Sequence, residues 1–230
     1  MRRLVVLIAA VLACALTARL GIWQLDRASQ KLALQARMEE QAKLPALGNA
    51  DLSANPDAIQ RRVVLHGRWQ PERTVWLDNR PMSGRVGFFV VTPLLLDGTG
   101  QTILVQRGWL PRNQLDRTAL PPLITPMGNV EVQGRLALTP SRLFEFTPST
   151  SGVIRQNLDV AAYAREIHQA LLPVTVWQTG PGADGDLKRD WAAPDLGLQT
   201  HYGYAFQWFA LCALILGLYV WFQLVKPRRR

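Results

Sequence analysis

Two long apolar runs lie near the ends of the chain, with a polar region between them. Residues 4–25 contain a single charged residue, Arg19, and residues 203–225 contain none. A helix rises about 1.5 Å per residue, so each run is long enough to cross the roughly 30 Å hydrocarbon layer of a membrane. The pattern therefore predicts two transmembrane helices. The first run also resembles a cleaved signal peptide, and that alternative stays open.

Short β-rich segments alternate with turn-forming residues in the middle region. Strands are predicted at residues 62–69, 74–78, 87–96, 102–110, 130–138, 153–156 and 174–179. This spacing is typical of an antiparallel sandwich or a small barrel. The link Gln70 to Arg73 predicts a hairpin between the first two strands, and a short helix is predicted from Asp159, as N-cap, to Leu172.

The fold class that follows is an α+β membrane protein. Two transmembrane helices, at the N and C termini, flank an exported and mainly antiparallel β domain of residues 26–202. Residues 26–44 contain no Gly or Pro and are rich in helix-forming residues, so the first helix is expected to continue beyond the membrane.

The positive charge of the chain is concentrated at its ends. Seven of the 26 Lys and Arg residues flank or enter the apolar runs, so the other 19 nearly balance the 17 acidic residues of the middle. A nucleic-acid-binding protein would carry its basic residues on the folded domain, so no nucleic acid is expected as a partner. Because Lys and Arg remain on the cytoplasmic side, we expect both termini in the cytoplasm of a bacterium, with the chain in the inner membrane and the central domain in the periplasm.

Signatures of enzymatic chemistry are missing. The sequence has no G-x-S-x-G, P-loop, G-x-G-x-x-G or H-E-x-x-H motif. Both cysteines lie inside the apolar runs, which excludes a disulfide or a thiol metal site in the exported domain. Of the three histidines, His66 and His168 are expected at the surface. Asp184 and Asp186 are interpreted as a solvated loop.

Two arginines occupy positions where an apolar residue is expected. Arg107 shares the strand parity of Ile103 and Val105, which places its guanidinium on an apolar face. An internal ion pair with the segment 78–80 is the favoured interpretation, and a binding surface is the alternative. Arg19 interrupts the first run, and it reaches either the membrane interface or a polar group of the second helix.

Four segments together resemble one family. They are LGIWQLDRASQK (20–31), WLDNRPMSGRVGFFVVTPLLL (76–96), ILVQRGWLPR (103–112) and HYGYAFQWFAL (201–211). This set is similar to the Surfeit locus protein 1 family, the membrane-anchored biogenesis factors of cytochrome c oxidase. The resemblance implies a non-enzymatic factor that acts around heme a insertion, with the catalytic subunit of the oxidase and other assembly factors as partners. It also implies that His201 is the iron ligand.

Six side chains near the exported ends of the two predicted helices could together hold a heme: His201, Tyr204, Trp208, Arg19, Trp23 and Arg27. The first three share one helix face, and the other three share a face of the first helix. A heme has an apolar ring, an iron that takes imidazole and propionates that attract cations. Two alternatives remain: these are ordinary residues of a membrane interface, or the protein is a structural chaperone of oxidase subunits without heme.

Overall fold

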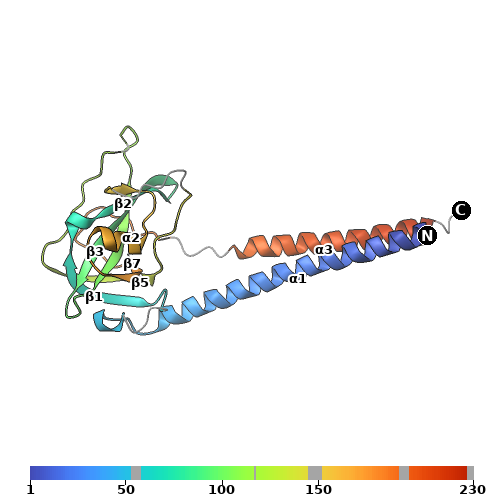
Figure 1. Ribbon diagram of the computed structural model, residues 1–230, viewed down its shortest axis with the longest axis horizontal. Helices are drawn as coiled ribbons and strands as arrows, with labels where there is room; N and C mark the ends of the chain where they lie inside the picture. Colours follow the sequence, from blue (N-terminus) through green and yellow to red (C-terminus); the bar gives the residue numbers. More distant parts are fainter. Residues whose placement is uncertain (53–57, 117, 145–151, 192–196, 227–230) are drawn as a thin grey trace. The chain divides into compact units, whose positions relative to one another are not determined.

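The computed structural model describes residues 1–52, 58–116, 118–144, 152–191 and 197–226. The chain divides into two compact units (Figure 1). One unit combines Met1–Arg37 with Ala193–Arg230, and the other is Met38–Ala192. The first contains the C-terminal helix and most of the N-terminal helix, and the second contains the end of the N-terminal helix and the strands of the described residues.

The helical unit is an antiparallel pair. Helix α1 spans Arg2–Lys43, and helix α3 spans Leu198–Val220 and continues as a π-helical turn over Trp221–Val225. Each helix is long and apolar enough to cross a membrane. Figure 1 shows α1 and α3 side by side. The prediction that the first helix continues through residues 26–44 is confirmed to Lys43, because nothing in this segment interrupts its helix-forming residues.

The second unit is a small β barrel. Its strands are β1 (Arg62–Trp69), β2 (Val75–Met82), β3 (Arg85–Leu96), β4 (Thr102–Pro111), β5 (Asn129–Ala137), β6 (Ile154–Arg155) and β7 (Leu171–Gln178). The sheet order is β1-β5-β7-β4-β3-β2-β6, and β1 also pairs with β3. The strands β1, β5, β7, β4 and β3 therefore form a closed ring, and β2 and β6 extend it. Pairing is antiparallel except for β4 with β7 and β2 with β6.

Alternating side chains of the ring strands fill the barrel. The buried apolar residues of this cluster include Val63, Leu65, Leu94, Leu96, Ile103, Val105, Val132, Leu136, Val174 and Val176. Every ring strand contributes two of them at alternate or near-alternate positions, as a sheet with one face turned inward requires. A second cluster packs the short helix α2 (Val160–Glu166) against β2, β3 and β4.

The predicted hairpin between the first two strands is wrong. Strand β1 pairs with β5 and with the end of β3, where Trp69 lies opposite Leu94. Strand β2 pairs with the first part of β3, from Arg85 opposite Met82 to Val91 opposite Val75. Because β3 is long enough to receive both strands at different points, the chain passes from one to the other through the 3-10 turn Pro71–Arg73 without pairing them.

The short helix is shorter than predicted. Asp159 is its N-cap, as expected, and accepts a hydrogen bond from the amide of Ala162 at 2.8 Å. The helix ends at Glu166 instead of Leu172. His168 takes a φ of 51°, and β7 begins at Leu171, which pairs with Thr102 of β4. Pairing with the barrel therefore prevails over helix propensity in the last residues.

Candidate functional site

Helices α1 and α3 meet along a seam of small and polar side chains. On α1 its residues are separated by three and four positions: Cys14, Thr17, Gly21, Gln24 and Ala28. Ala28 and, on α3, Ala205 are 1% and 2% exposed. A Cβ at Gly21 would lie 2.8 Å from the ring of Phe209, so glycine permits the close approach there. The spacing is that of a left-handed coiled coil.

His201 lies on this seam, in the first turn of α3. Its Nδ1 is 2.7 Å from Oε1 of Gln24 on α1. Nε2 has no hydrogen-bond partner among the residues that the structure describes. The side chain is half-buried. Nδ1 is therefore held by a hydrogen bond, and Nε2 is available to bind a metal ion.

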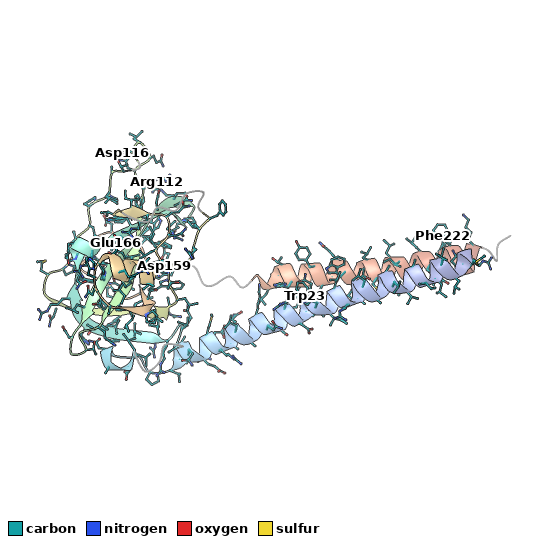
Figure 2. All side chains as sticks on the ribbon, viewed as in Figure 1. Trp23, Arg112, Asp116, Asp159, Glu166 and Phe222 are labelled. Atoms are coloured by element: carbon teal, nitrogen blue, oxygen red, sulfur yellow. The ribbon has the colours of Figure 1, made fainter. Side chains whose placement is uncertain are left out.

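The other predicted site residues divide between the seam and the outer surface. Trp208 is half-buried two turns after His201 on the same face of α3. Tyr204 and Trp23 are each 48% exposed (Trp23 is labelled in Figure 2). The side chains of Tyr204 and Trp23 therefore lie largely on the outer surface of the helix pair.

The two predicted cations lie on the outside of α1. Arg19 and Arg27 are both exposed. The guanidinium of Arg27 lies 5.7 Å from the ring centroid of Trp23, and its Nη1 donates to Oε1 of Gln30 at 3.0 Å. Arg27 and Trp23 thus form one contiguous surface patch. A cation beside an apolar ring suits a ligand that is itself an apolar ring with carboxylates.

Sequence reasoning missed Gln24. The residue lies in a segment that was interpreted only as the end of an apolar run. One sequence pattern could have identified it. Thr17, Gly21, Gln24 and Ala28 are separated by four, three and four positions, and this spacing predicts that they share one contact face of the helix. A polar residue on such a face requires a partner, and His201 supplies it.

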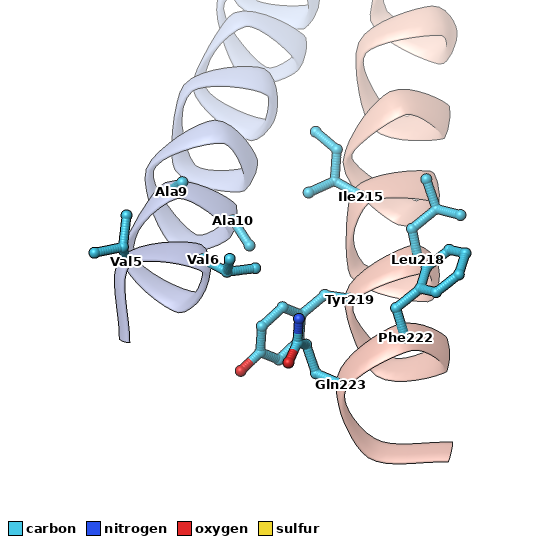
Figure 3. Close-up of a pocket in the computed structure, with 9 residues that line it drawn as sticks. All are labelled: Val5, Val6, Ala9, Ala10, Ile215, Leu218, Tyr219, Phe222 and Gln223. Carbon is cyan, nitrogen blue, oxygen red and sulfur yellow. The ribbon is translucent and has the colours of Figure 1, made fainter. Parts of the chain in front are cut away.

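The opposite end of the helix pair has a different character. There α1 and α3 leave an apolar groove of about 430 Å³ (Figure 3). Its lining residues are Val5, Val6, Ala9, Ala10, Ile215, Leu218, Tyr219, Phe222 and Gln223. Tyr219 and Gln223 extend between the helices in Figure 3. The groove offers no carboxylate, thiol or imidazole for metal chemistry.

Arg107 is fully buried in the β domain, as predicted. Nη1 donates to Oγ1 of Thr125 at 2.7 Å, and Nη2 donates to the carbonyl oxygen of Ile124 at 2.8 Å. Nη2 is also 3.6 Å from Oδ2 of Asp184, and the guanidinium lies 4.8 Å from the Trp69 ring centroid. Burial lowers the pKa of Arg107, and the attraction of Asp184 opposes that shift. These contacts give Arg107 a structural role.

The predicted partner of Arg107 is wrong. Asp78 pairs instead with Arg112, with 3.3 Å between Oδ1 and Nη1. The carboxylate beside Arg107 belongs to Asp184, which also pairs with Arg189. The interpretation of Asp184 as a solvated loop residue is therefore wrong, since its side chain is 2% exposed. The loop folds inward because two guanidinium groups attract its carboxylate.

The remaining histidines stay at the surface, as predicted. His66 is exposed and lies 3.5 Å from a carboxylate oxygen of Glu131. His168 is exposed after the end of α2. Within the described ranges, no three His, Cys, Asp or Glu side chains are grouped to hold a metal ion.

Comparison with known proteins gives a consistent match. The model of the SURF1 family matches residues 11–213. Surfeit locus protein 1 of Mus musculus is 26% identical over 233 residues, covering 89% of this chain and 70% of the mouse protein. Surfeit locus protein 1 of Arabidopsis thaliana is 34% identical over 117 residues, which are 45% of this chain and 33% of the plant protein.

The name of a yeast relative refers to the assembly of cytochrome oxidase. Cytochrome oxidase assembly protein SHY1 of Saccharomyces cerevisiae is 32% identical over 96 residues. The match covers 40% of this chain and 24% of the yeast protein. The chain thus spans a quarter to a third of the yeast and plant relatives, and a larger share of the mouse protein.

Proposed function

Because the chain belongs to the SURF1 family, we propose that it is a membrane-anchored assembly factor of cytochrome c oxidase that holds heme a before its insertion into the catalytic subunit. The name of the yeast relative supports the assembly role. The resemblance of residues 201–211 to the family supports the heme step. The role is non-enzymatic, and the partners are the oxidase subunit and other assembly factors.

One observation supports heme binding most directly. His201 has its Nδ1 held by Gln24 at 2.7 Å and its Nε2 without a partner in the described part of the chain. A neutral imidazole with one free nitrogen is a common protein ligand of heme iron. When bound, the heme would supply an iron with an open coordination position. The residues present therefore fit the group.

The neighbouring side chains would supply the other contacts. Tyr204 and Trp208 offer apolar area beside His201, and Trp23 offers it on α1. Arg19 and Arg27 supply cations that attract propionates. All of these except Trp208 are exposed on the outside of the helix pair, so the bound ring would lie partly against lipid or the partner protein. This open arrangement suits a factor that must release its heme.

The membrane placement belongs to the same proposal. The two helices of sufficient length and apolarity form an anchor in a bacterial inner membrane. Basic residues outside both runs keep the two termini in the cytoplasm and the β barrel in the periplasm. His201 then lies at the periplasmic edge of the membrane. Reporter fusions after residues 60 and 230 test this: a periplasm-active reporter working at the C terminus contradicts it.

The test is the absorption spectrum of the protein purified from cells that make heme a. The wild type should carry heme with an imidazole ligand. His201→Ala should lose the heme and reduce oxidase assembly, while its membrane insertion stays normal because residue 201 lies outside the apolar run. His66→Ala and His168→Ala are matched controls on the β domain and should keep the heme.

Two outcomes would redirect the assignment. Heme loss in either control, with normal binding by His201→Ala, would overturn His201 as ligand. A wild type without heme that still supports oxidase assembly would favour the structural chaperone.

A further inference from the structure

A single hydrogen bond joins the two helices at the proposed iron ligand. Oε1 of Gln24 lies 2.7 Å from Nδ1 of His201. We propose that Gln24 is the positioning residue for His201: it selects the imidazole tautomer whose Nε2 carries the lone pair and orients that nitrogen for a metal. This inference rests on the proposed function, and in it Gln24 acts on the metal only through its hydrogen bond to His201.

The chemistry of the amide determines the tautomer. An amide oxygen only accepts hydrogen bonds, so the nitrogen that faces it must carry the proton. A neutral imidazole has one proton, and with that proton on Nδ1 the lone pair lies on Nε2. If Gln24 presented its NH₂ group instead, Nδ1 would accept and the proton would lie on Nε2. The orientation in which the amide oxygen faces the ring therefore favours iron binding at Nε2.

The seam brings Gln24 within reach of the ring. Gly21 lies one turn from Gln24 and lets α1 approach Phe209 of α3 closely. Ala28 and Ala205 are buried on either side of the contact. With small residues above and below, the helix backbones are close enough for a glutamine to span the gap in a direct hydrogen bond.

The surroundings strengthen this bond. It is partly buried, with Ala28 and Ala205 on either side, and a hydrogen bond at such a site is screened less than in water. Partners that hold the second nitrogen of a metal-binding histidine fix its ring orientation and raise its basicity, and their loss typically weakens metal binding by roughly 10-fold to 100-fold. Gln24 has the geometry of such a partner.

The first experiment needs no heme. Nitrogen-15 NMR of the full-length apoprotein in detergent, with the His201 signal assigned by its loss in His201→Ala, reports which nitrogen carries the proton. The wild type should show the proton on Nδ1 at a pH where the ring is neutral. Gln24→Leu should lose this preference. A wild-type ring protonated on Nε2, or an unchanged tautomer in Gln24→Leu, would overturn the proposal.

The second experiment measures affinity with ferric heme b as the probe. Gln24→Leu should bind it roughly 10-fold to 100-fold more weakly than the wild type. Gln24→Glu should retain binding and lower the reduction potential of the bound heme, because a carboxylate accepts the hydrogen bond more strongly and makes the imidazole a better donor. A residue that only packs the helices would not shift this potential.

Gln207→Leu is the matched control, since Gln207 is exposed on α3. It should leave the tautomer, the affinity and the potential unchanged. If the wild type binds heme and Gln24→Leu binds it equally well, the positioning role is wrong while the proposed function survives. If the wild type binds no heme, the proposed function fails, and the NMR result still decides what Gln24 does to His201.

Discussion

Arg107 and His201 are both polar residues placed among apolar ones, and they differ in how completely their partners enclose them. Arg107 has 0% exposure, two hydrogen bonds, a carboxylate and an aromatic ring around it. His201 is half-buried and uses one of its two nitrogens. A polar side chain that is fully enclosed by its partners stabilises a fold, whereas one anchored on a single side keeps an atom for a ligand.

The largest effect should follow from removing the enclosed cation. Arg107→Met leaves the buried carboxylate of Asp184 with Arg189 alone and leaves the carbonyl oxygen of Ile124 without its donor. Breaking a buried pair costs about 3–5 kcal/mol, so the free energy of unfolding in detergent should fall by that order. Arg135→Met, at an exposed position on β5, is the control and should change it little. Equal stability of the two variants would show that Arg107 does not have a structural role.

A smaller loss should follow when both buried charges are replaced. In the double variant Arg107→Met with Asp184→Leu, no buried carboxylate is left short of a cation, and only the 15% exposed side chain of Arg189 loses its partner. We expect its unfolding free energy to lie between those of the wild type and Arg107→Met, measured by the same denaturant titration. A double variant less stable than Arg107→Met would mean that Asp184 matters mainly through Arg189.

A partly exposed ion pair should contribute less. Arg155 holds Glu166 of α2 through two contacts, at 2.8 and 2.5 Å (Glu166 is labelled in Figure 2), and this bonding lowers the pKa of Glu166 against the opposing effect of burial. Since the side chain of Glu166 is 40% exposed, the pair should be worth about 0.2–1 kcal/mol.

The sign of the pH dependence follows from the direction of that shift. A carboxyl with a lowered folded pKa stabilises the protein above its unfolded value of about 4.3 and loses the contribution as the pH falls through the folded value. Glu166→Gln should therefore be less stable than the wild type near pH 7, with a difference that disappears in acid. Asp186→Asn, at an exposed position, should show no such convergence.

A small change in stability is expected for His201→Ala. Its side chain is half-buried on the seam, and its removal costs the hydrogen bond with Gln24. At a partly exposed site such a bond lies at the low end of the usual contribution of about 0.5–1.5 kcal/mol, so thermal unfolding should stay close to that of the wild type while heme binding is lost. A loss of several kcal/mol would place His201 with Arg107 among the structural residues.

Local patterns predicted much of the fold. Hydrophobic runs identified α1 and α3, alternation placed most strands within a few residues, and Asp159 was correctly identified as an N-cap. Strand parity also predicted the burial of Arg107. These features depend on residues close in sequence, whose spacing alone determines which face they occupy.

Partners distant in sequence could not be predicted in this way. The pairing of β1 with β3 and β5 depends on closure of the barrel, and the chain between β1 and β2 gives no sign of it. Asp184 lies 77 positions from Arg107 along the chain, and nothing in its loop distinguishes it from Asp186. The candidate site was predicted as six residues, and the hydrogen bond that anchors its histidine was missed.

The sequence by itself determined the two terminal helices, the β-rich domain between them and the family resemblance, and it led to the hypothesis that His201 is the iron ligand. Only the tertiary structure decided that Gln24 meets His201, that Asp184 meets Arg107 and that the strands close into a barrel. The physical reason is that the periodicity of a sequence indicates whether a side chain is buried or exposed. The partner of that side chain depends on which distant segments pack together, and this packing is decided by the free energy of the whole molecule.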